Sequence, residues 1–213
     1  DHCTAVSTFV RKGGADRSRR HILDNAARLF RESGYAAVSL RSIAAASGLK
    51  AGSLYYHFAS KEEIVSEILR LGVEHVYVAV RDAVEALGAE ASPQQRVGTA
   101  VETHLRVLLE LQDYTSANIR IFGQVPPAVR ERHIALRDEY EAFWTRLLRR
   151  YLRDCGLGGQ RALPMSRFFV IGAMNSTLEW YRPGVRPISS VARELTRILL
   201  HGLHGEPVAR PRR

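Results

Sequence analysis

Apolar residues in this chain recur at helical spacing along most of its length. Ile22, Ala26, Leu29 and Phe30 follow the i, i+4, i+7, i+8 pattern of a helix with one buried face. The run from residue 129 to 151 keeps similar spacing over many turns. No stretch combines strict apolar–polar alternation with a hairpin dipeptide, so strands are not indicated. We therefore predict an all-α protein with about nine helices.

The helix boundaries follow from capping residues, glycines and prolines. Gly34 is expected to end the first helix, and Ser39 to cap the second. Ser60 and Glu63 have the spacing of a capping box, in which each side chain accepts a hydrogen bond from the other residue's amide. Three short helices precede about six longer ones. The predicted helices cover residues 18–33, 39–48, 50–58, 61–87, 93–112, 114–123, 127–155, 163–181 and 189–203.

Composition excludes several classes of protein. The 213 residues are 46% hydrophobic and 25% charged, which is typical of a globular chain that buries a core without disulfides. Cys3 and Cys155 lie far apart with no metal-binding spacing around them, so we expect neither a zinc site nor any cofactor. No apolar run is long enough to cross a membrane or to direct export, and a soluble cytoplasmic protein is expected.

Positive charge is concentrated at the two ends of the sequence. The formal net charge is +9, and residues 1–60 hold nine Lys or Arg against four Asp or Glu. Three arginines lie in the last six residues. Residues 1–17 are expected to form a flexible basic arm, and 206–213 a flexible basic tail. Such a distribution favours contact with a polyanion, although a solvated basic surface that maintains solubility would also produce it.

Residues 39–58 have the pattern of a helix-turn-helix. Two short helices are joined at Gly48, and Ile43, Leu54 and Phe58 can pack back on the first helix. The remaining positions of the second short helix have no core to fill and are expected to point outward. There they can reach base edges and phosphates in a DNA groove. The sequence therefore predicts a DNA-binding domain over residues 18–63.

Residues 20–69 contain a series of short elements in a characteristic order and spacing: Ile22-Leu23, Ala26-Ala27, Leu29-Phe30, Gly34-Tyr35, Ile43-Ala44, Gly48, Gly52, Leu54-Tyr55, His57-Phe58 and Lys61-Glu62. With these elements the segment resembles the N-terminal domain of the TetR family of bacterial transcriptional repressors. The resemblance implies DNA contacts at Arg41, Lys50, Ala51, Ser53, Tyr55, Tyr56, His57 and Lys61. Two alternatives stay open, in which Tyr55 is mainly a packing residue and His57 caps its own helix.

The same resemblance implies that residues 64–205 form a ligand-binding and dimerising bundle. Polar residues such as His104, Asn118 and Asn175 interrupt apolar helix faces there, as they would around a cavity. The segment 180–184, WYRPG, resembles a subgroup that represses fatty-acid and steroid breakdown and senses acyl-CoA thioesters. The expected ligand-binding residues are His104, Asn118, Phe122, Trp144, Phe168, Asn175 and Trp180. A drug-like or other apolar effector remains the alternative.

The last two helices carry more apolar residues than one chain needs to bury, and the resemblance implies that they pair with a second copy. A two-fold homodimer on a pseudo-palindromic operator, released by its ligand, is the expected mode of action. An enzyme is the remote alternative. The chain contains no P-loop, GxSxG or HExxH motif, so we expect no catalysis.

Overall fold

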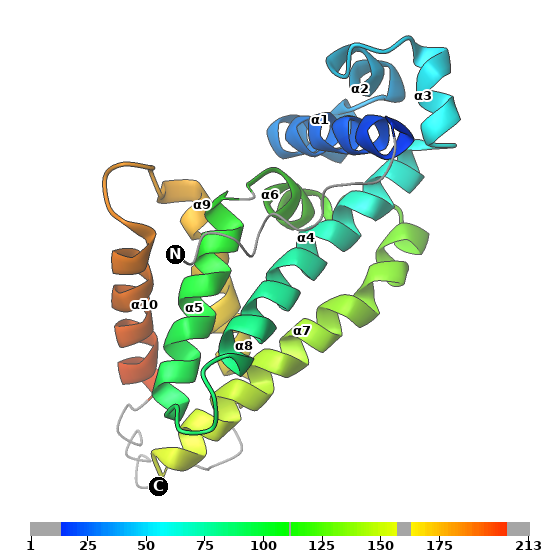
Figure 1. Cartoon of the computed structure of the whole chain (residues 1–213). Helices are drawn as coiled ribbons and strands as arrows, with labels where there is room; N and C mark the ends of the chain where they lie inside the picture. Colours follow the sequence, from blue (N-terminus) through cyan, green and yellow to red (C-terminus); the bar gives the residue numbers. More distant parts are fainter. Residues whose placement is uncertain (1–13, 111, 157–162, 204–213) are drawn as a thin grey trace, which may run out of the picture.

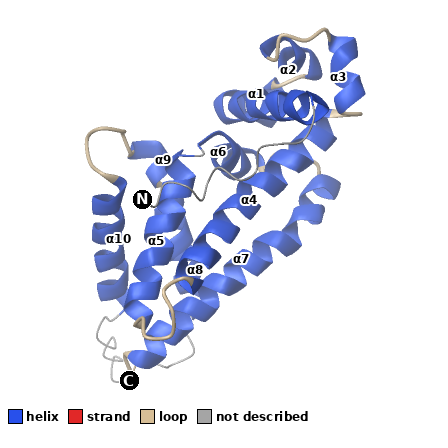
Figure 2. Cartoon of the chain, viewed as in Figure 1, coloured by secondary structure: helices blue, strands red, loops and turns tan. Residues whose placement is uncertain are grey.

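The computed structural model of the chain describes residues 14–110, 112–156 and 163–203, and within those ranges every regular element is a helix (Figures 1 and 2). The helices are α1 (Gly14–Ala37), α2 (Leu40–Ala46), α3 (Ala51–His57), α4 (Lys61–Glu85), α5 (Pro93–Glu110), α6 (Gln112–Ile121), α7 (Pro127–Asp154), α8 (Leu163–Asn175), α9 (Thr177–Trp180) and α10 (Ile188–Leu203). The all-α prediction is confirmed. None of these helices is both long enough and apolar enough to cross a membrane.

Helices α1 to α3 form a small unit, called the head, at one end of the molecule (Figure 1). Ser39 caps α2 as predicted, because its Oγ accepts a hydrogen bond from the amide of Ser42 at 3.1 Å. Gly48 has a φ of 67°, a left-handed conformation that glycine adopts without strain, and it turns the chain from α2 into α3. The predicted helix-turn-helix is therefore present.

Helices α4 to α10 form a larger unit, called the bundle. Long helix α4 leaves the head and runs beside α7 along the bundle, while α5 and α10 lie at its other side (Figure 1). Short helix α6 lies directly beneath α1 and also packs against α4. The head therefore meets the bundle through two helices, one continuous with it in sequence and one that comes from far along the chain.

Three details differ from the sequence prediction. Helix α1 begins at Gly14 rather than Ser18, so the end of the expected flexible arm is helical, while residues 1–13 and the tail 206–213 lie outside the described residues. It also runs on to Ala37 instead of ending at residue 33, although Gly34, with a φ of 77°, interrupts the regular helix where its end was predicted. The expected helix 163–181 is interrupted at Ser176, although that residue keeps a right-handed helical conformation. The predicted count of about nine helices is met when α8 and α9 are taken as one interrupted helix.

The third difference lies in the capping box that begins α4. The amide of Glu63 donates to Ser60 Oγ at 3.2 Å as predicted, but the Glu63 carboxylate accepts from the amide of Ala59 at 2.8 Å, one residue before Ser60. Glu63 also pairs with Arg19 of the head, and this second partner draws its carboxylate away from the Ser60 amide. The start of α4 is thus tied to α1.

Two apolar cores hold the chain together. The first joins the head to the beginning of α4, to α6 and to the start of α7, and its fully buried side chains include Ile22, Phe30 and Leu54. The second fills the rest of the bundle around Trp144, which is also fully buried. Because α6 contributes Ala117 and Ile121 to the first core, the head cannot move as an independent domain without disturbing the bundle.

Candidate functional site

The outer face of α3 is the most exposed aromatic surface of the head. Tyr55 and Tyr56 are 58% and 84% exposed, whereas Leu54 beside them is fully buried. A helix of seven residues is not stable alone in water, so its conformation depends on the packing of Leu54 and Phe58 against α1 and α2. Buried positions on one face therefore hold the outward side chains in a fixed orientation.

Most of the predicted DNA-contacting residues lie together on this exposed surface. Arg41 projects from the first turn of α2, and Lys50, Ala51 and Ser53 lie in or just before the first turn of α3; all four are exposed. A Cβ added at Gly52 would meet no atom within 4 Å, so the start of α3 has open space in front of it. A groove of DNA could approach the backbone closely there.

Two of the predicted residues are engaged within the head itself. The Lys61 ammonium donates to the backbone oxygen of Tyr35 at 2.6 Å and lies 3.9 Å from the centre of the Tyr35 ring. Partial burial lowers the pKa of Lys61, and Glu62 nearby offsets part of that effect. His57 is half-buried, and its ring meets that of Tyr56 edge to face. A DNA contact by Lys61 would have to share its ammonium with Tyr35.

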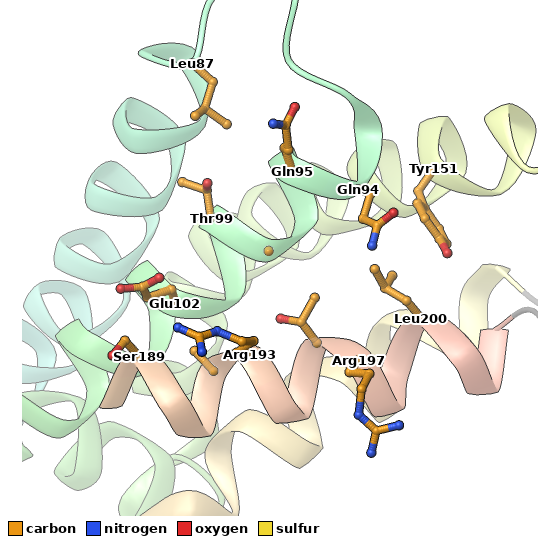
Figure 3. Close-up of a pocket in the computed structure, with 13 residues that line it drawn as sticks. Leu87, Gln94, Gln95, Thr99, Glu102, Tyr151, Ser189, Arg193, Arg197 and Leu200 are labelled. Carbon is orange, nitrogen blue, oxygen red and sulfur yellow. The ribbon is translucent and has the colours of Figure 1, made fainter. Parts of the chain in front are cut away.

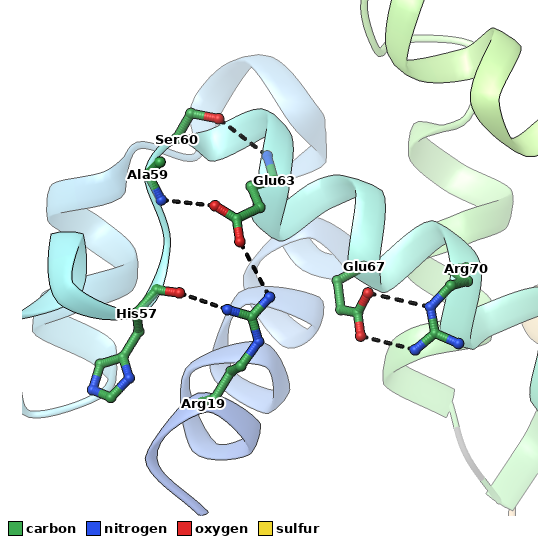
Figure 4. A network of polar contacts seen from close by, with 7 residues as sticks. All are labelled: Arg19, His57, Ala59, Ser60, Glu63, Glu67 and Arg70. Carbon is green, nitrogen blue, oxygen red and sulfur yellow. Dashed lines mark hydrogen bonds and ion pairs between the residues drawn. The ribbon is translucent and has the colours of Figure 1, made fainter. Parts of the chain in front are cut away.

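Arg19 joins the end of α3 to the start of α4 (Figure 4). Its guanidinium donates to the backbone oxygen of His57 at 2.6 Å and to Glu63 at 3.2 Å, and it stacks 4.0 Å above the Phe58 ring. The side chains of Arg19 and Glu63 are each more than a third exposed, so the ion pair between them contributes little to stability. Its effect is geometric, because it sets the direction in which α4 leaves the head.

A second set of contacts joins the head to α6 and to the turn that follows it. Tyr114 donates from its hydroxyl to Asp24 of α1 at 2.5 Å, and the amide of Tyr35 donates to the Gln124 side chain at 2.9 Å. Burial raises the pKa of Tyr114, and the bond to Asp24 raises it further, so this hydroxyl stays protonated. Any displacement of α6 is therefore transmitted to α1.

A small cavity, partly open to solvent, lies between the bundle helices on the other side of α6. Its volume is about 60 Å³, and five helices contribute to its wall. The lining residues are Gly72, Val73, Val76, His104, Thr115, Asn118, Ile119, Arg137, Tyr140, Glu141, Ile171 and Asn175. Small-molecule sites are usually about 300–1,000 Å³. In this conformation the cavity could hold about two water molecules, each taking about 30 Å³, and a larger ligand would have to spread the helices.

His104 and Asn118, each 2% exposed, are the most deeply buried polar residues of the cavity wall. Nδ1 of His104 lies 2.6 Å from the Tyr140 hydroxyl, and its Nε2 lies 3.3 Å from Oδ1 of Asn175. A neutral imidazole that donates from Nε2 and accepts at Nδ1 satisfies both contacts. Burial lowers the pKa of His104 to about 4, which the bond to Asn175 only partly opposes. The ring is therefore uncharged near neutral pH.

Asn118 connects the cavity wall to α4. Its side-chain NH₂ donates to the buried backbone oxygen of Leu69 at 2.7 Å, and its Oδ1 accepts from Arg137 at 2.8 Å. The two helices touch nearby, because a Cβ on Gly72 would lie 2.7 Å from the backbone oxygen of Tyr114 and 2.9 Å from Asn118 Cβ. Helices α4 and α6 are thus in direct contact at Gly72, and a ligand that displaces one displaces the other.

The structure brings three of the seven predicted ligand-binding residues to this cavity, namely His104, Asn118 and Asn175. The other four lie elsewhere. Trp144 packs beside His104, with ring centres 6.3 Å apart, but is not part of the lining. Phe122 packs on the first core, next to Arg137.

Phe168 and Trp180 are 50% and 55% exposed, on the outer faces of α8 and α9. The sequence prediction placed both residues at the ligand on the strength of the resemblance to acyl-CoA-sensing members. Here the inward positions of α8 are filled by other residues, among them Val170 and Met174.

Sequence reasoning missed several lining residues, notably Gly72, Arg137 and Tyr140. Tyr140 lies on the apolar stripe of α7, one turn before Trp144, and that position indicates only a packing residue. A charged residue at 137 is indistinguishable in the sequence from a solvated one. Gly72 offered one signal, because a glycine in the middle of a long helix costs about 1 kcal/mol relative to alanine and needs a packing reason.

A wider groove lies on the outside of the bundle between α5 and α10 (Figure 3). Its volume is about 710 Å³, and it is open to solvent. Gln94, Gln95 and Glu102 line one side, and Arg193 and Arg197 line the other. Arg197 pairs with Glu194 and Glu102 with Arg106, so most of its charges are balanced. None of the predicted ligand-binding residues lies in it.

Family models match both parts of the chain. Residues 22–68 match the model of bacterial regulatory proteins of the tetR family, and residues 90–203 match a tetracyclin repressor-like C-terminal domain. The second match alone covers more than half of the chain. The first covers the whole helix-turn-helix and most of α1.

Known proteins resemble the chain over almost its full length. The transcriptional repressor KstR2 of Mycobacterium tuberculosis is 30% identical over 209 residues, which cover 93% of this chain and 99% of KstR2. The structure of the regulator PfmR from Thermus thermophilus is 31% identical, with a TM-score of 0.72 over 84% of this chain and 97% of PfmR.

The regulator AibR, solved with isovaleryl coenzyme A and operator DNA, shares the fold at 22% identity, with a TM-score of 0.71 over 86% of this chain and 98% of AibR. The two family matches and the sequence identity to KstR2 establish the family of this chain, and the fold agrees with them. The chain belongs to the TetR family of bacterial regulatory proteins.

Proposed function

We propose that this protein is a transcriptional repressor that binds operator DNA through the head and releases it when a small molecule enters the bundle. The observation that carries the DNA-binding part is the exposed face of α3, where Tyr55 and Tyr56 project from a helix anchored by the fully buried Leu54. The basic residues Arg41 and Lys50 flank this face and suit phosphate contacts. KstR2, which the chain resembles over nearly its whole length, is itself a repressor.

The cavity between the bundle helices supports the ligand-responsive part of the proposal. Polar groups from α5, α6, α7 and α8 line it beside apolar ones, yet it is too small for an ordinary ligand. Ligand entry must therefore favour a conformation with a wider cavity, and α4 and α6 would move together because they touch at Gly72. Both helices hold the head, through Glu63 and Tyr114, so the head would turn with them.

An acyl-CoA thioester is the effector class that we propose. The 180–184 segment resembles acyl-CoA-sensing members, and AibR shows that a protein of this fold was solved with isovaleryl coenzyme A and DNA together. A drug-like apolar effector is the second candidate, favoured by the apolar cavity residues Val73, Val76 and Ile171. In either case ligand and DNA must weaken each other's binding to the same degree, typically by about 1–3 kcal/mol.

Homodimer formation is part of the proposal. Phe168 and Phe169 of α8 and Ile198 of α10 are at least half exposed, and an apolar surface of this kind on a stable protein usually meets a partner. Among the other apolar residues expected at this interface, Met174 and Val191 are instead buried within the chain. Phe169→Glu is expected to give monomers in sedimentation experiments, whereas Val185→Glu, at an exposed loop position, is expected to leave dimers intact.

The test of the function is fluorescence anisotropy on labelled DNA from the region upstream of the protein's own gene, at fixed salt. Octanoyl-CoA and octanoate are titrated into the complex. Release by octanoyl-CoA is the expected outcome. Tight binding to the DNA that no acyl compound disturbs would keep the DNA-binding role but reject the acyl effector, and absence of salt-sensitive DNA binding would reject the repressor itself.

A matched pair of charge-removing variants locates the DNA interface. Lys50→Ala in the head is expected to weaken DNA binding and to lower the slope of log K against log salt by about 0.9 for each phosphate that the variant no longer neutralises. Arg150→Ala removes the same charge from an exposed position on α7 and is expected to change neither quantity. Equal effects of the two substitutions would show that binding follows overall charge and not the head.

A further inference from the structure

Arg137 is the charged residue of the cavity wall that no carboxylate neutralises at close range. It lies on α7, half-buried, and its Nη1 donates to Asn118 Oδ1 at 2.8 Å. Its guanidinium also stacks 4.0 Å above the Phe122 ring. Asn118 and Phe122 are both uncharged. A guanidinium carries five N–H donors, so only part of its capacity is used by these contacts.

Neither of the nearby carboxylates forms an ion pair with Arg137. Glu141 follows Arg137 by one helical turn and also lines the cavity, but it pairs with Arg167 of α8 at 3.1 Å. Asp138 is exposed. Among the described residues, neither of these nor any other acid lies within ion-pair distance of Arg137. Burial lowers the pKa of Arg137, and Glu141 and Asp138 oppose that effect from farther away.

Other arginines near the junction of head and bundle differ in this respect. Arg19 pairs with Glu63, Arg31 with Asp113, and Arg70 with both Glu67 and Glu74. Burying part of a cation without a counter-ion is costly, and proteins usually avoid it unless the charge has a use. The same region of the molecule supplies carboxylate partners for other arginines. The lack of a carboxylate partner is therefore specific to Arg137.

We propose that Arg137 anchors the effector by donating hydrogen bonds to an acyl oxygen, either a carboxylate or a thioester carbonyl, and that it leaves Asn118 in doing so. This inference rests on the proposed function, since it names the ligand chemistry of the same cavity and the contact whose loss starts the conformational change. Apart from Glu141, whose charge is paired with Arg167, the remaining cavity groups agree with it. His104 is neutral, Tyr140 and Asn175 are uncharged, and Val73, Val76 and Ile171 offer an apolar wall for the acyl chain.

If Arg137 exchanges Asn118 for the ligand, the effect of ligand binding can be transmitted to the head. Asn118 is held between Arg137 and the Leu69 backbone oxygen of α4. When Arg137 turns to the ligand, Asn118 Oδ1 loses its donor in a buried position, which costs about 1–3 kcal/mol unless the side chain rearranges. Rearrangement of Asn118 loosens its bond to Leu69, close to the point where α4 and α6 cross. A cationic effector would be repelled by Arg137, so the proposal also separates acyl compounds from basic drugs.

Three ligands of equal chain length test the anchor: octanoyl-CoA, octanoate and 1-octanol, the last lacking the acyl oxygen. Binding is followed by isothermal titration calorimetry, and DNA release by anisotropy. Arg137→Gln shortens the side chain only modestly and removes its charge. It is expected to weaken binding of octanoyl-CoA and octanoate about tenfold or more, because hydrogen bonds from a charged donor contribute about 1.5–3 kcal/mol. Binding of 1-octanol is expected to be unchanged.

The control is Arg132→Gln, at an exposed position of α7 with no ion pair among the described residues, and it should behave as the wild type with all three ligands. If Arg137→Gln does not fold, Arg137→Lys keeps the charge but not the planar donor pair, and an intermediate loss is expected. Unchanged binding of the acyl compounds, an equal loss for 1-octanol, or a wild type that binds neither acyl compound would each overturn the anchor.

The two proposals fail in different ways. A wild type that octanoyl-CoA releases from DNA, with a variant that responds equally, keeps the repressor function and rejects Arg137. A wild type that binds octanoyl-CoA through Arg137 while holding its DNA supports the anchor and rejects release as its consequence.

Discussion

The head and the bundle bury different kinds of side chain. In the head, the fully buried positions Ile22, Phe30 and Leu54 are apolar, and Ser47 is the one polar residue among its described buried side chains. In the bundle, His104, Asn118 and Thr177 are among the buried residues, and a cavity remains between the helices. An apolar, filled core gives a single rigid arrangement, whereas polar groups around a cavity can exchange partners. This difference suits a head that presents a fixed surface to DNA and a bundle that changes its conformation when a ligand binds.

The largest effect is expected from opening a void in the rigid core. Leu54→Ala deletes a fully buried side chain between α3 and α1 and should lower the free energy of unfolding by about 3–5 kcal/mol. Tyr55→Ala, one residue away and exposed, should change it by less than about 1 kcal/mol. Urea unfolding measures both. Equal losses would mean that the head is not held by its core in the way described.

Acid should affect the bundle through His104. Its folded pKa of about 4 lies below the value near 6.5 of an unfolded histidine, so the unfolded chain binds more protons between those pH values. Stability from this residue is complete above pH 6.5, falls as the pH drops from 6.5 to 4, and reaches a loss of about 3 kcal/mol.

His75 and His133 are also held below their ordinary pKa by burial and contribute with the same sign. The His104 contribution is isolated by comparing the wild type with His104→Gln, whose unfolding free energy should depend less steeply on pH across that window. Parallel curves for the two proteins would show that His104 is already accessible to protons in the fold.

The next largest change in stability is expected at the close contact between α4 and α6. Gly72→Ala would place a Cβ 2.7 Å from the Tyr114 backbone oxygen, and overpacking of this kind costs about 1–3 kcal/mol. Gly98→Ala is the matched control, because a Cβ there meets only Thr196 at 3.8 Å and the helix gains up to about 1 kcal/mol in propensity. Thermal unfolding should therefore move in opposite directions for the two substitutions. Destabilisation by both would indicate that the loss at Gly72 is not specific to the crossing.

The same contrast explains what could be predicted from the sequence. The head follows from local signals, since Ser39, Gly48 and Ser60 fix its helix ends and Leu54 fixes the buried face of α3. Each signal acts within a few residues, and the family resemblance adds the order of the elements.

The cavity depends instead on residues that are far apart in the chain. Arg137 and Asn118 meet only after α6 and α7 have packed, and the chain between them gives no sign of the contact. Phe168 and Trp180 were expected at the ligand from the family resemblance, but the packing of α8 and α9 leaves both about half exposed. The break at Ser176 was missed because neither glycine nor proline marks it, and its backbone hardly departs from a helix.

The smallest change in stability is expected at the contact that joins the two units. Tyr114→Phe removes the hydroxyl that donates to Asp24 at 2.5 Å, and Asp24 is exposed, so water can replace the lost donor. The cost should be about 1–2 kcal/mol. Tyr77→Phe serves as the control, since its ring packs against Tyr140 and Phe143 and none of its described contacts uses the hydroxyl.

The informative readout for Tyr114→Phe is the coupling between effector and DNA, measured as the ratio of DNA affinities with and without octanoyl-CoA. If α6 transmits the movement of the cavity wall to α1 through this bond, the ratio should fall towards one while the affinity of the free protein for DNA stays within about threefold, because α3 and Arg19 are untouched. An unchanged ratio would leave α4 and the Arg19–Glu63 contact as the path from the bundle to the head, and Arg19→Gln would then be the variant in which the coupling should fail.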